Sequence, residues 1–323
     1  MTIRILHQGL LNFPEGHPLA DRIEIVSPDP AHLRSPDHDL VLIAPDSPTL
    51  HFEDLDRIID RLNREAGPAV CSFRESDDAD FSILAELPGG ISLRALRPQS
   101  SQWLGWKPAG HDLSVDMERT VRDAAWLIGL QIADLGGQVH LMSAERESGQ
   151  SPDLPELAPD DTELVNRWLG EALTGMPHPT GLVNQTDWRA LQAGLLLIHG
   201  FLDQSHSFSQ SVEGRGLHAA GDYWHGIMHR REPDASNAKY WFRRVDSHPV
   251  HDELSTRIAS MSVDLPGIDR VFDDAGSWSA AAFVDLCEEA RRYGDHELTQ
   301  TSERLQWIEM LLLLRQNWRD CCS

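Results

Sequence analysis

The sequence predicts an α/β domain over residues 1–145, a linker over residues 146–161 and an all-α domain over residues 162–323. In the first part, short apolar runs typical of strands alternate with helical periodicity, which favours a small, mostly parallel sheet. Residues 144–161 are polar and contain three prolines, as expected of a linker. After residue 162 few strand-like runs remain, and helical spacing of apolar residues dominates.

The strands of the α/β domain are predicted from apolar runs that end in turn-forming residues. These runs cover residues 3–6, 23–26, 39–44, 69–73, 91–96 and 138–142. A helix is predicted over residues 52–66, because apolar residues recur there at i, i+3, i+4 and i+7, and another over residues 114–135. The pair Gly136-Gly137 ends this second helix.

This succession of elements is similar to the layout of flavodoxin-like and receiver domains. A receiver domain needs an acidic pair after its first strand, and the run RILHQGLLN contains none, so Asp46 after the third strand is interpreted as a turn residue. The fingerprints GxGxxG and GxxxxGKS/T are also missing from the sequence, which argues against the common dinucleotide and P-loop sites.

The C-terminal domain is predicted to consist of helices joined by short connections. The predicted helices cover residues 162–174, 187–204, 235–245, 279–293 and 297–317. The sequence shows no internal repeat at the periods of solenoid proteins, so we expect one packed helical domain.

The charge of the chain limits its partners. The 28 Lys and Arg residues face 51 Asp and Glu residues, which gives a net charge of −23 and disfavours nucleic acid and anionic membrane surfaces. The longest apolar run near the C-terminus, Met310–Leu314, is too short to span a bilayer. The four cysteines form no CxxC pair and the N-terminus lacks the pattern of a signal peptide. We therefore expect a cytoplasmic protein, for which a homo-oligomer is compatible with the sequence.

Histidines are concentrated in one segment, where seven of the sixteen lie within residues 199–251. On one predicted helix, two histidines and an aspartate are spaced at i, i+4 and i+7. Two further histidines are spaced at i and i+4. Such spacing can bring the ligands of a divalent cation together. The predicted metal ligands are His199, Asp203, His206, His225 and His229. This donor set suits Zn, Mn, Fe or Ni. The alternative is a hydrogen-bonded polar network in a helical core.

The same segment is basic in an acidic chain. Residues 225–244 hold five basic residues against two acidic ones, a local net charge of +3. Guanidinium groups recognise carboxylate and phosphate, and aromatic rings offer stacking faces, so the segment predicts a site for a small anionic molecule. The predicted binding residues are Arg230, Arg231, Lys239, Tyr240 and Trp224. The alternative is a short helix whose aromatic residues form its core face and whose arginines complement its dipole.

A family resemblance is carried by this segment. The run YWHGIMHRREPDASNAKYWFRRV (Tyr223–Val245), with FVDLCEEARR (Phe283–Arg292), resembles an uncharacterised bacterial family with this wording. The resemblance covers the second half of the chain. It implies no activity and transfers no catalytic residue.

The sequence therefore favours a metal-dependent enzyme, of hydrolase or lyase type, that acts on a small anionic substrate in a helical pocket. A bound cation would activate water or polarise the substrate, Glu232 is the candidate general base, and His229 is the other candidate catalytic residue. The first alternative is a metal-free binding or sensor protein for an anionic metabolite. The second is a structural or scaffold protein with a buried histidine network.

Overall fold

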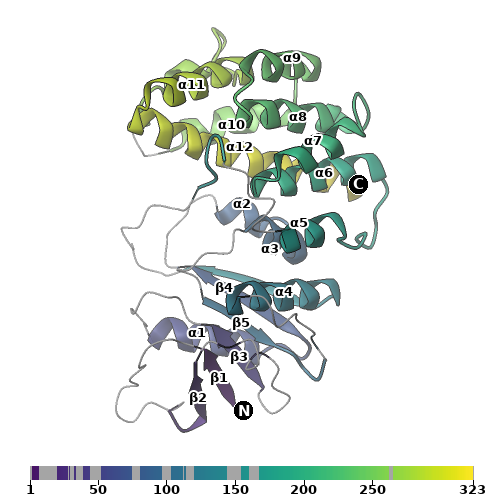
Figure 1. The fold of residues 1–323 in the computed structure, drawn as a ribbon, viewed down its shortest axis with the longest axis vertical. Helices are drawn as coiled ribbons and strands as arrows, with labels where there is room; N and C mark the ends of the chain where they lie inside the picture. Colours follow the sequence, from purple (N-terminus) through teal and green to yellow (C-terminus); the bar gives the residue numbers. More distant parts are fainter. Residues whose placement is uncertain are drawn as a thin grey trace. The chain divides into compact units, whose positions relative to one another are not determined.

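The chain folds into two compact units in the computed structural model. It describes residues 2–6, 20–27, 29, 33, 39–43, 52–74, 81–96, 103–111, 113, 120–143, 154–159, 167–261 and 265–322. One unit comprises Met1–Ala79 and Pro88–Pro152, and the other comprises Asp80–Leu87 and Asp153–Ser323. The first contains the sheet and the second is helical (Figure 1), in agreement with the predicted change from α/β to all-α structure.

The N-terminal unit is built on a six-stranded sheet, which confirms the predicted mostly parallel arrangement. Its strands are β1 (Ile3–Leu6), β2 (Ile23–Val26), β3 (Leu40–Ile43), β4 (Ala69–Arg74), β5 (Trp103–Lys107) and β6 (Gln138–Ser143). They lie in the order β2-β1-β3-β5-β4-β6. All pairings are parallel except those of β5, which runs antiparallel to both β3 and β4.

The predicted strand over residues 91–96 is wrong, and β5 was not predicted. Residues Gly89–Ala95 form the helix α3, in which the Ser92 hydroxyl donates to the Pro88 carbonyl oxygen at 3.1 Å. A short apolar run that is buried on all sides lacks the periodicity that separates a strand from a helix. The strand β5 was missed because Gly105 interrupts its apolar run. A Cβ at this position would lie 3.1 Å from Leu62 Cδ1, so the close packing favours glycine there.

Two predicted helices flank the sheet. The helix α1 (Phe52–Asn63) buries Leu55, Ile58, Ile59 and Leu62 in one core cluster with residues of β1, β3 and β4, as its spacing predicts. The helix α4 (Val121–Asp134) begins after Thr120, whose hydroxyl accepts a hydrogen bond from the Asp123 backbone at 3.1 Å. The predicted start at residue 114 lies outside the described residues.

The C-terminal unit is formed by helices, and each of the five predicted ranges contains helix in its described residues. Its helices are α2 (Phe81–Ala85), α5 (Arg167–Thr174), α6 (Gln185–Ile198), α7 (Leu202–Gln210), α8 (Ala220–Arg231), α9 (Ala235–Val245), α10 (Pro249–Ala259), α11 (Ala280–Tyr293) and α12 (His296–Cys322). The middle of α12 is buried around its circumference, as expected of a helix that other helices surround. None of the described helices combines the length and apolar character needed to cross a bilayer.

The predicted helix over residues 187–204 is interrupted. The helix α6 ends at Ile198 and α7 begins at Leu202, because Gly200 adopts a φ of 83° and the Phe201 backbone N–H returns to the Leu196 carbonyl oxygen at 3.0 Å. The uninterrupted spacing predicted that His199 shares a helix face with Asp203 and His206. The break at Gly200 places His199 on a different helix from the other two.

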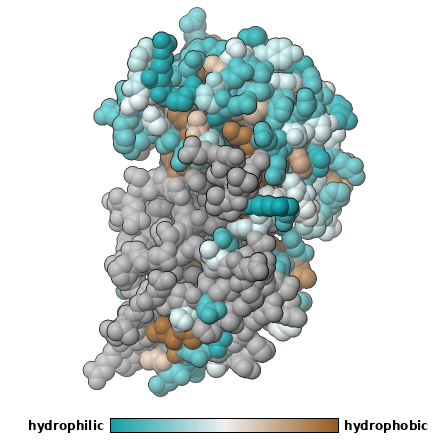
Figure 2. Space-filling model, viewed as in Figure 1, coloured by the Kyte–Doolittle hydropathy of each residue, from teal (hydrophilic) through white to brown (hydrophobic). Residues whose placement is uncertain are grey.

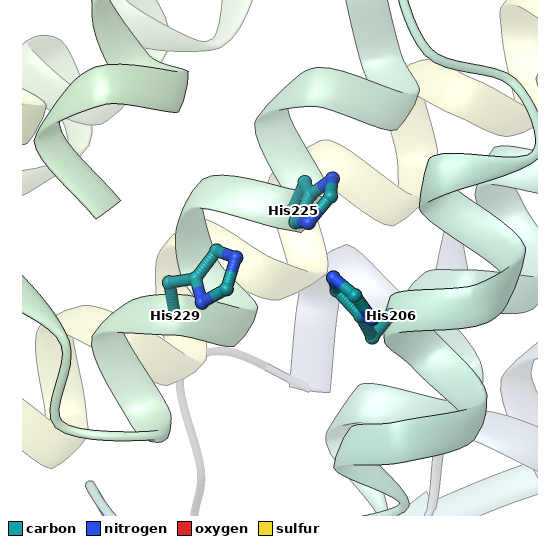
Figure 3. A group of neighbouring side chains, drawn as sticks. All are labelled: His206, His225 and His229. Carbon is teal, nitrogen blue, oxygen red and sulfur yellow. The ribbon is translucent and has the colours of Figure 1, made fainter. Parts of the chain in front are cut away.

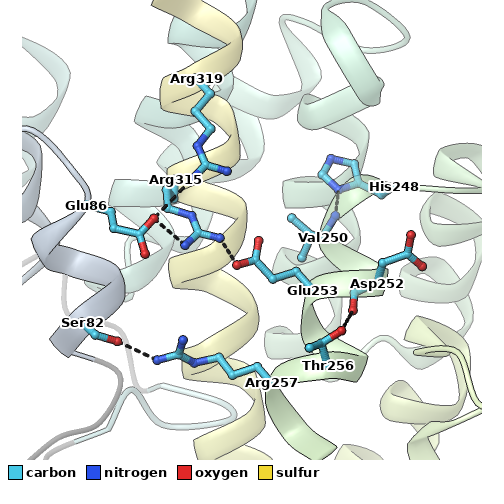
Figure 4. Close-up of polar contacts among 10 residues, drawn as sticks. All are labelled: Ser82, Glu86, His248, Val250, Asp252, Glu253, Thr256, Arg257, Arg315 and Arg319. Atoms are coloured by element: carbon cyan, nitrogen blue, oxygen red, sulfur yellow. Dashed lines mark hydrogen bonds and ion pairs between the residues drawn. The ribbon is translucent and has the colours of Figure 1, made fainter. Parts of the chain in front are cut away.

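Residues 80–87 precede α3 in sequence yet belong to the helical unit. The Glu86 carboxylate pairs with Arg315 at 2.8 Å and Arg319 at 3.3 Å, both on α12 (Figure 4). The guanidinium of Arg257 on α10 donates to the Ser82 hydroxyl at 2.9 Å. These contacts hold α2 against α12 and α10.

The surface of the helical unit is largely polar on the face drawn in Figure 2, where hydrophobic residues form small separate patches. The core of this unit is closely packed where α6 meets α8. A Cβ added at Gly194 on α6 would overlap the indole of Trp224 on α8, which is fully buried and donates to Asn317 Oδ1 at 2.6 Å. Glycine at this position lets the two helices approach closely.

We expect Gly194→Ala to lower the free energy of unfolding by about 1–3 kcal/mol, because the added methyl overpacks a region that cannot yield. Thermal or urea denaturation measures the effect. The control is Gly170→Ala on α5, where the nearest atoms to the new methyl belong to the flexible end of Gln204. This control should be neutral or slightly stabilising, and equal losses in both variants would contradict the expectation.

Candidate functional site

Three histidines of the C-terminal unit form a compact cluster. His206 lies on α7, and His225 and His229 lie on α8. One ligand atom of each residue lies within 4.8 Å of the others. The ring centroids are 4.6 Å apart for His206 and His225, 4.9 Å for His225 and His229 and 5.5 Å for His206 and His229. Figure 3 shows a ring nitrogen of each residue directed toward the space between the three rings.

The two helices determine this geometry. The i, i+4 spacing on α8 places His225 and His229 one turn apart on the same face, as predicted, and their rings stack at an interplanar angle of 18°. The helix α7 packs against α8 and presents His206 edge-on to both rings. Since Ser205 and Ser209 on α7 are buried, His206 lies beside the packed face of its helix.

His225 is the most deeply buried of the three, with 1% of its surface exposed. It stacks on Trp241 of α9 with centroids 3.8 Å apart. Neither ring nitrogen has a hydrogen-bond partner in the described part of the chain. Burial, followed by the proximity of His206 and His229, lowers the pKa of His225 to about 3, so its imidazole is neutral at pH 7. A neutral, buried imidazole without partners is a strong candidate ligand for a cation.

His229 is oriented by a carboxylate. Its Nδ1 lies 2.9 Å from Glu232 Oε2, so Nδ1 donates and Nε2 carries the free lone pair. Burial lowers the pKa of His229, although Glu232 acts in the opposite direction. The Asn237 amide nitrogen lies 3.0 Å from Nε2 and can donate to it, so a bound cation would replace this amide. A histidine whose second nitrogen contacts a carboxylate is the usual arrangement of metal ligands.

His199 and Asp203 do not belong to this cluster. His199 is the residue at which α6 ends, and its backbone N–H bonds to the Leu196 carbonyl oxygen at 3.2 Å. Asp203 is exposed in the first turn of α7. Of the five predicted metal ligands, the structure therefore brings three together.

The two arginines predicted to bind an anion lie inside the helical unit. Arg230 pairs with Glu309 of α12 at 2.6 Å, with both side chains at most 1% exposed, and lies over the Phe283 ring at 4.3 Å. The Tyr223 hydroxyl donates to the same carboxylate at 3.0 Å. Arg231 is also buried and donates to the backbone carbonyl oxygens of Leu197 and Glu156. Both guanidinium groups thus connect helices and loops within the unit.

The other predicted binding residues are dispersed. Lys239 pairs with Asp285 of α11, and Tyr240 is exposed and accepts a hydrogen bond from Arg244 at 3.2 Å. Trp224 is enclosed in the core. The structure does not bring the five predicted binding residues to one surface. Most of these side chains instead contact partners that are distant in the sequence.

Three residues near the cluster lie outside the predicted ligand and binding residues. Trp241 stacks on His225, and Asn237 contacts His229. Arg244 lies 4.8 Å from the centroid of the Trp241 ring and pairs with Asp222 at 3.2 Å and Glu213 at 2.9 Å. The helical spacing of α9 could have indicated the first two, since positions 237 and 241 are one turn apart.

Comparisons with known proteins add no identity, because no family model, curated protein or solved structure matches the chain. The resemblance of Tyr223–Val245 to an uncharacterised family stays a prediction, and the site is argued from its geometry alone.

Proposed function

We propose that the helical unit binds a divalent cation through His206, His225 and His229, and that the protein is a metal-dependent enzyme of hydrolase or lyase type. The observation that supports this most directly is the buried His225 ring, whose two nitrogens lack partners in the described part of the chain while two further imidazoles face it. Three histidines with an open fourth position are typical of catalytic zinc, which makes Zn²⁺ the first candidate.

The substrate class follows from charge. Three neutral imidazoles leave the double positive charge of the cation uncompensated, so an anionic oxygen is the favoured fourth ligand. Arg244, which lies over Trp241 at the edge of the cluster, is already paired with Asp222 and Glu213, so the positive charge at the site would come from the cation itself. A small anionic substrate is the class that fits this balance. A bound cation would supply Lewis-acid polarisation of that substrate or a water molecule of lowered pKa.

In this proposal Glu232 is a positioning residue. It accepts the Nδ1 proton of His229 and thereby directs the lone pair of Nε2 toward the other two rings. Its side chain is 53% exposed, so it also borders the solvent side of the cluster. His206 and His225 would serve as ligands only, and Trp241 would hold the plane of His225.

Metal loading tests the proposal. Untagged full-length protein is stripped with a chelator and reloaded separately with Zn²⁺, Mn²⁺, Fe²⁺ and Ni²⁺, and the metal content is measured by mass spectrometry. We expect stoichiometric uptake of at least one of these ions and a melting temperature that rises with it; an ion present at about 100 times its Kd adds roughly 2.7 kcal/mol to the stability. Hydrolysis of small phosphate and carboxylate esters is then compared between stripped and reloaded protein.

Substoichiometric uptake of all four ions would overturn the metal site and favour the scaffold alternative with a buried histidine network. Stoichiometric uptake without metal-dependent turnover of either ester class would retain the site and remove the hydrolase part of the proposal.

We also infer a flavodoxin-like arrangement for the N-terminal unit. Apart from β5, its parallel strands follow the order β2-β1-β3-β4-β6, which corresponds to 2-1-3-4-5 in chain order. In the sheet, the antiparallel strand β5 then lies as an additional strand between β3 and β4, although it follows β4 in the chain. This inference concerns the fold alone.

A further inference from the structure

The helical unit contains a cavity whose lining does not include the three-histidine cluster. Its volume is about 690 Å³. It opens where α9 ends, α10 begins and the loop before α11 passes. The polar residues on its wall include His218, Arg243, Asp246, His248, His251 and Asp252.

His248, which lines this cavity, carries a buried ring nitrogen without a hydrogen-bond partner in the described part of the chain. Its Nδ1 accepts a hydrogen bond from the Val250 backbone N–H at 3.2 Å, which caps α10 (Figure 4). The neutral ring therefore carries its proton on Nε2. Only 4% of His248 is exposed, and Nε2 has no partner in the described part of the chain. A metal ion at Nε2 would compete with this proton, whereas an acceptor oxygen would satisfy it.

Two further features attract a negatively charged oxygen. The 14-residue helix α11 begins at this cavity with Ala280 and Ala281, and its N-terminus carries partial positive charge. Arg243 contributes a guanidinium group to the same wall. A carboxylate group suits such a combination of N–H donors.

The remaining charges exclude a simple anion. Asp246, Asp252 and Asp273 also line the cavity, so three carboxylates face one guanidinium, and the formal balance is −2 while the imidazoles are neutral. Asp273 Oδ1 already accepts from the Ala275 and Ser277 backbones, each at 2.9 Å, but Asp246 and Asp252 stand exposed at the rim. Such a rim favours a ligand that also carries a positive group.

The backbone around the cavity is strained. His218 and Ala219 adopt φ values of 54° and 50°, and Asp246 has a φ of 56° with a ψ of −108°. Non-glycine residues hold such conformations at a cost, and this strain is frequent at ligand sites.

We propose that this cavity binds a small molecule with both a carboxylate and an ammonium group, the chemical class of the free amino acids. The carboxylate lies toward His248 and the N-terminus of α11, and the ammonium group lies toward the carboxylates of Asp246 and Asp252. This ligand is additional to the anion of the metal site, and the inference does not depend on that site.

Binding is tested on the full-length protein in the presence of a chelator. The twenty free amino acids are screened by thermal shift, and any that raise the melting temperature are measured by calorimetry together with their N-acetyl and amide derivatives. We expect at least one amino acid to bind, with affinity reduced at least tenfold when either charged group is blocked. His248→Asn retains an N-cap acceptor for α10 but lacks the distal donor, and should weaken binding by about 10–100-fold.

Asp252→Asn should weaken binding of the free amino acid by about tenfold and should leave the affinity for its N-acetyl derivative unchanged, because that derivative lacks the ammonium group. His296→Asn, a substitution of an exposed histidine at the start of α12, is the control and should bind normally. The proposal is overturned if no amino acid binds, or if binding is the same in the His248→Asn and control proteins. His225→Gln should bind the amino acid normally, so failure at one site is separable from failure at the other.

Discussion

We expect replacement of His225 by glutamine to reduce the affinity for the divalent cation proposed at the three-histidine cluster more than 100-fold. The substitution removes the central ligand of the His206–His225–His229 set, and even loss of a residue that only orients a ligand costs about 10–100-fold. Isothermal titration of stripped protein with Zn²⁺ measures the change. We expect the same loss for His206→Gln, because both residues contribute one of only three imidazoles.

The matched controls separate a three-ligand site from the five-ligand set that the sequence predicted. Asp203→Asn alters an exposed carboxylate on α7, and His199→Asn alters the residue at which α6 ends. Both variants should bind the ion within about threefold of the unaltered protein. A loss of more than tenfold in either one would show that the protein uses ligands outside the three-histidine cluster.

A further substitution distinguishes a metal ligand from a member of a structural polar network. Since His225 makes no hydrogen bond in the described part of the chain, His225→Leu should change the stability of the stripped protein by no more than about 1 kcal/mol. A histidine that satisfies buried partners would cost more when removed, because those partners would be left unpaired. Urea denaturation of stripped protein would reveal such a cost.

Local patterns in the sequence were sufficient to place His225 and His229 on one face of one helix, α8. The i, i+4 spacing on α8 survives folding because the helix runs unbroken through both residues. The structure places His199 apart from this set, because α6 ends before Gly200, within the predicted helix. A single glycine inside a helical pattern is compatible with either outcome, and the surrounding packing decides between them.

Charge was harder to interpret than spacing. Arg230 lies two residues before Glu232 in a basic segment, yet it pairs with Glu309, which lies 79 residues away in the sequence. Burial removes the basis for predicting an anion site from this segment, because a guanidinium that is enclosed with a carboxylate contributes no positive potential at the surface. The cavity at His248 was not predicted, because its wall is assembled from α9, α10 and the loop before α11, which are separate in the sequence.

Substitution of Arg230 by methionine will lower the free energy of unfolding by about 3–5 kcal/mol. The change removes one partner of a buried ion pair and leaves the completely enclosed Glu309 carboxylate with the Tyr223 hydroxyl as its remaining donor among the described residues. Tyr223 itself is buried, and burial followed by Glu309 raises its pKa, so it stays a neutral donor that cannot supply the missing charge. Denaturant titration followed by far-ultraviolet circular dichroism, which reports mainly on the helices, measures the loss.

Two comparisons make this expectation specific to a buried pair. In Arg230→Met/Glu309→Leu, both charges are gone, so the double variant should recover at least half of the stability lost by the single variant. Arg270→Met removes an ion pair with Glu289, which is 2.5 Å long but has both side chains more than a third exposed, and should cost no more than about 1 kcal/mol. If Arg230→Met cost as little as Arg270→Met, Arg230 would have to be accessible to water, and the anion-binding role that the basic segment predicted for it would regain its support.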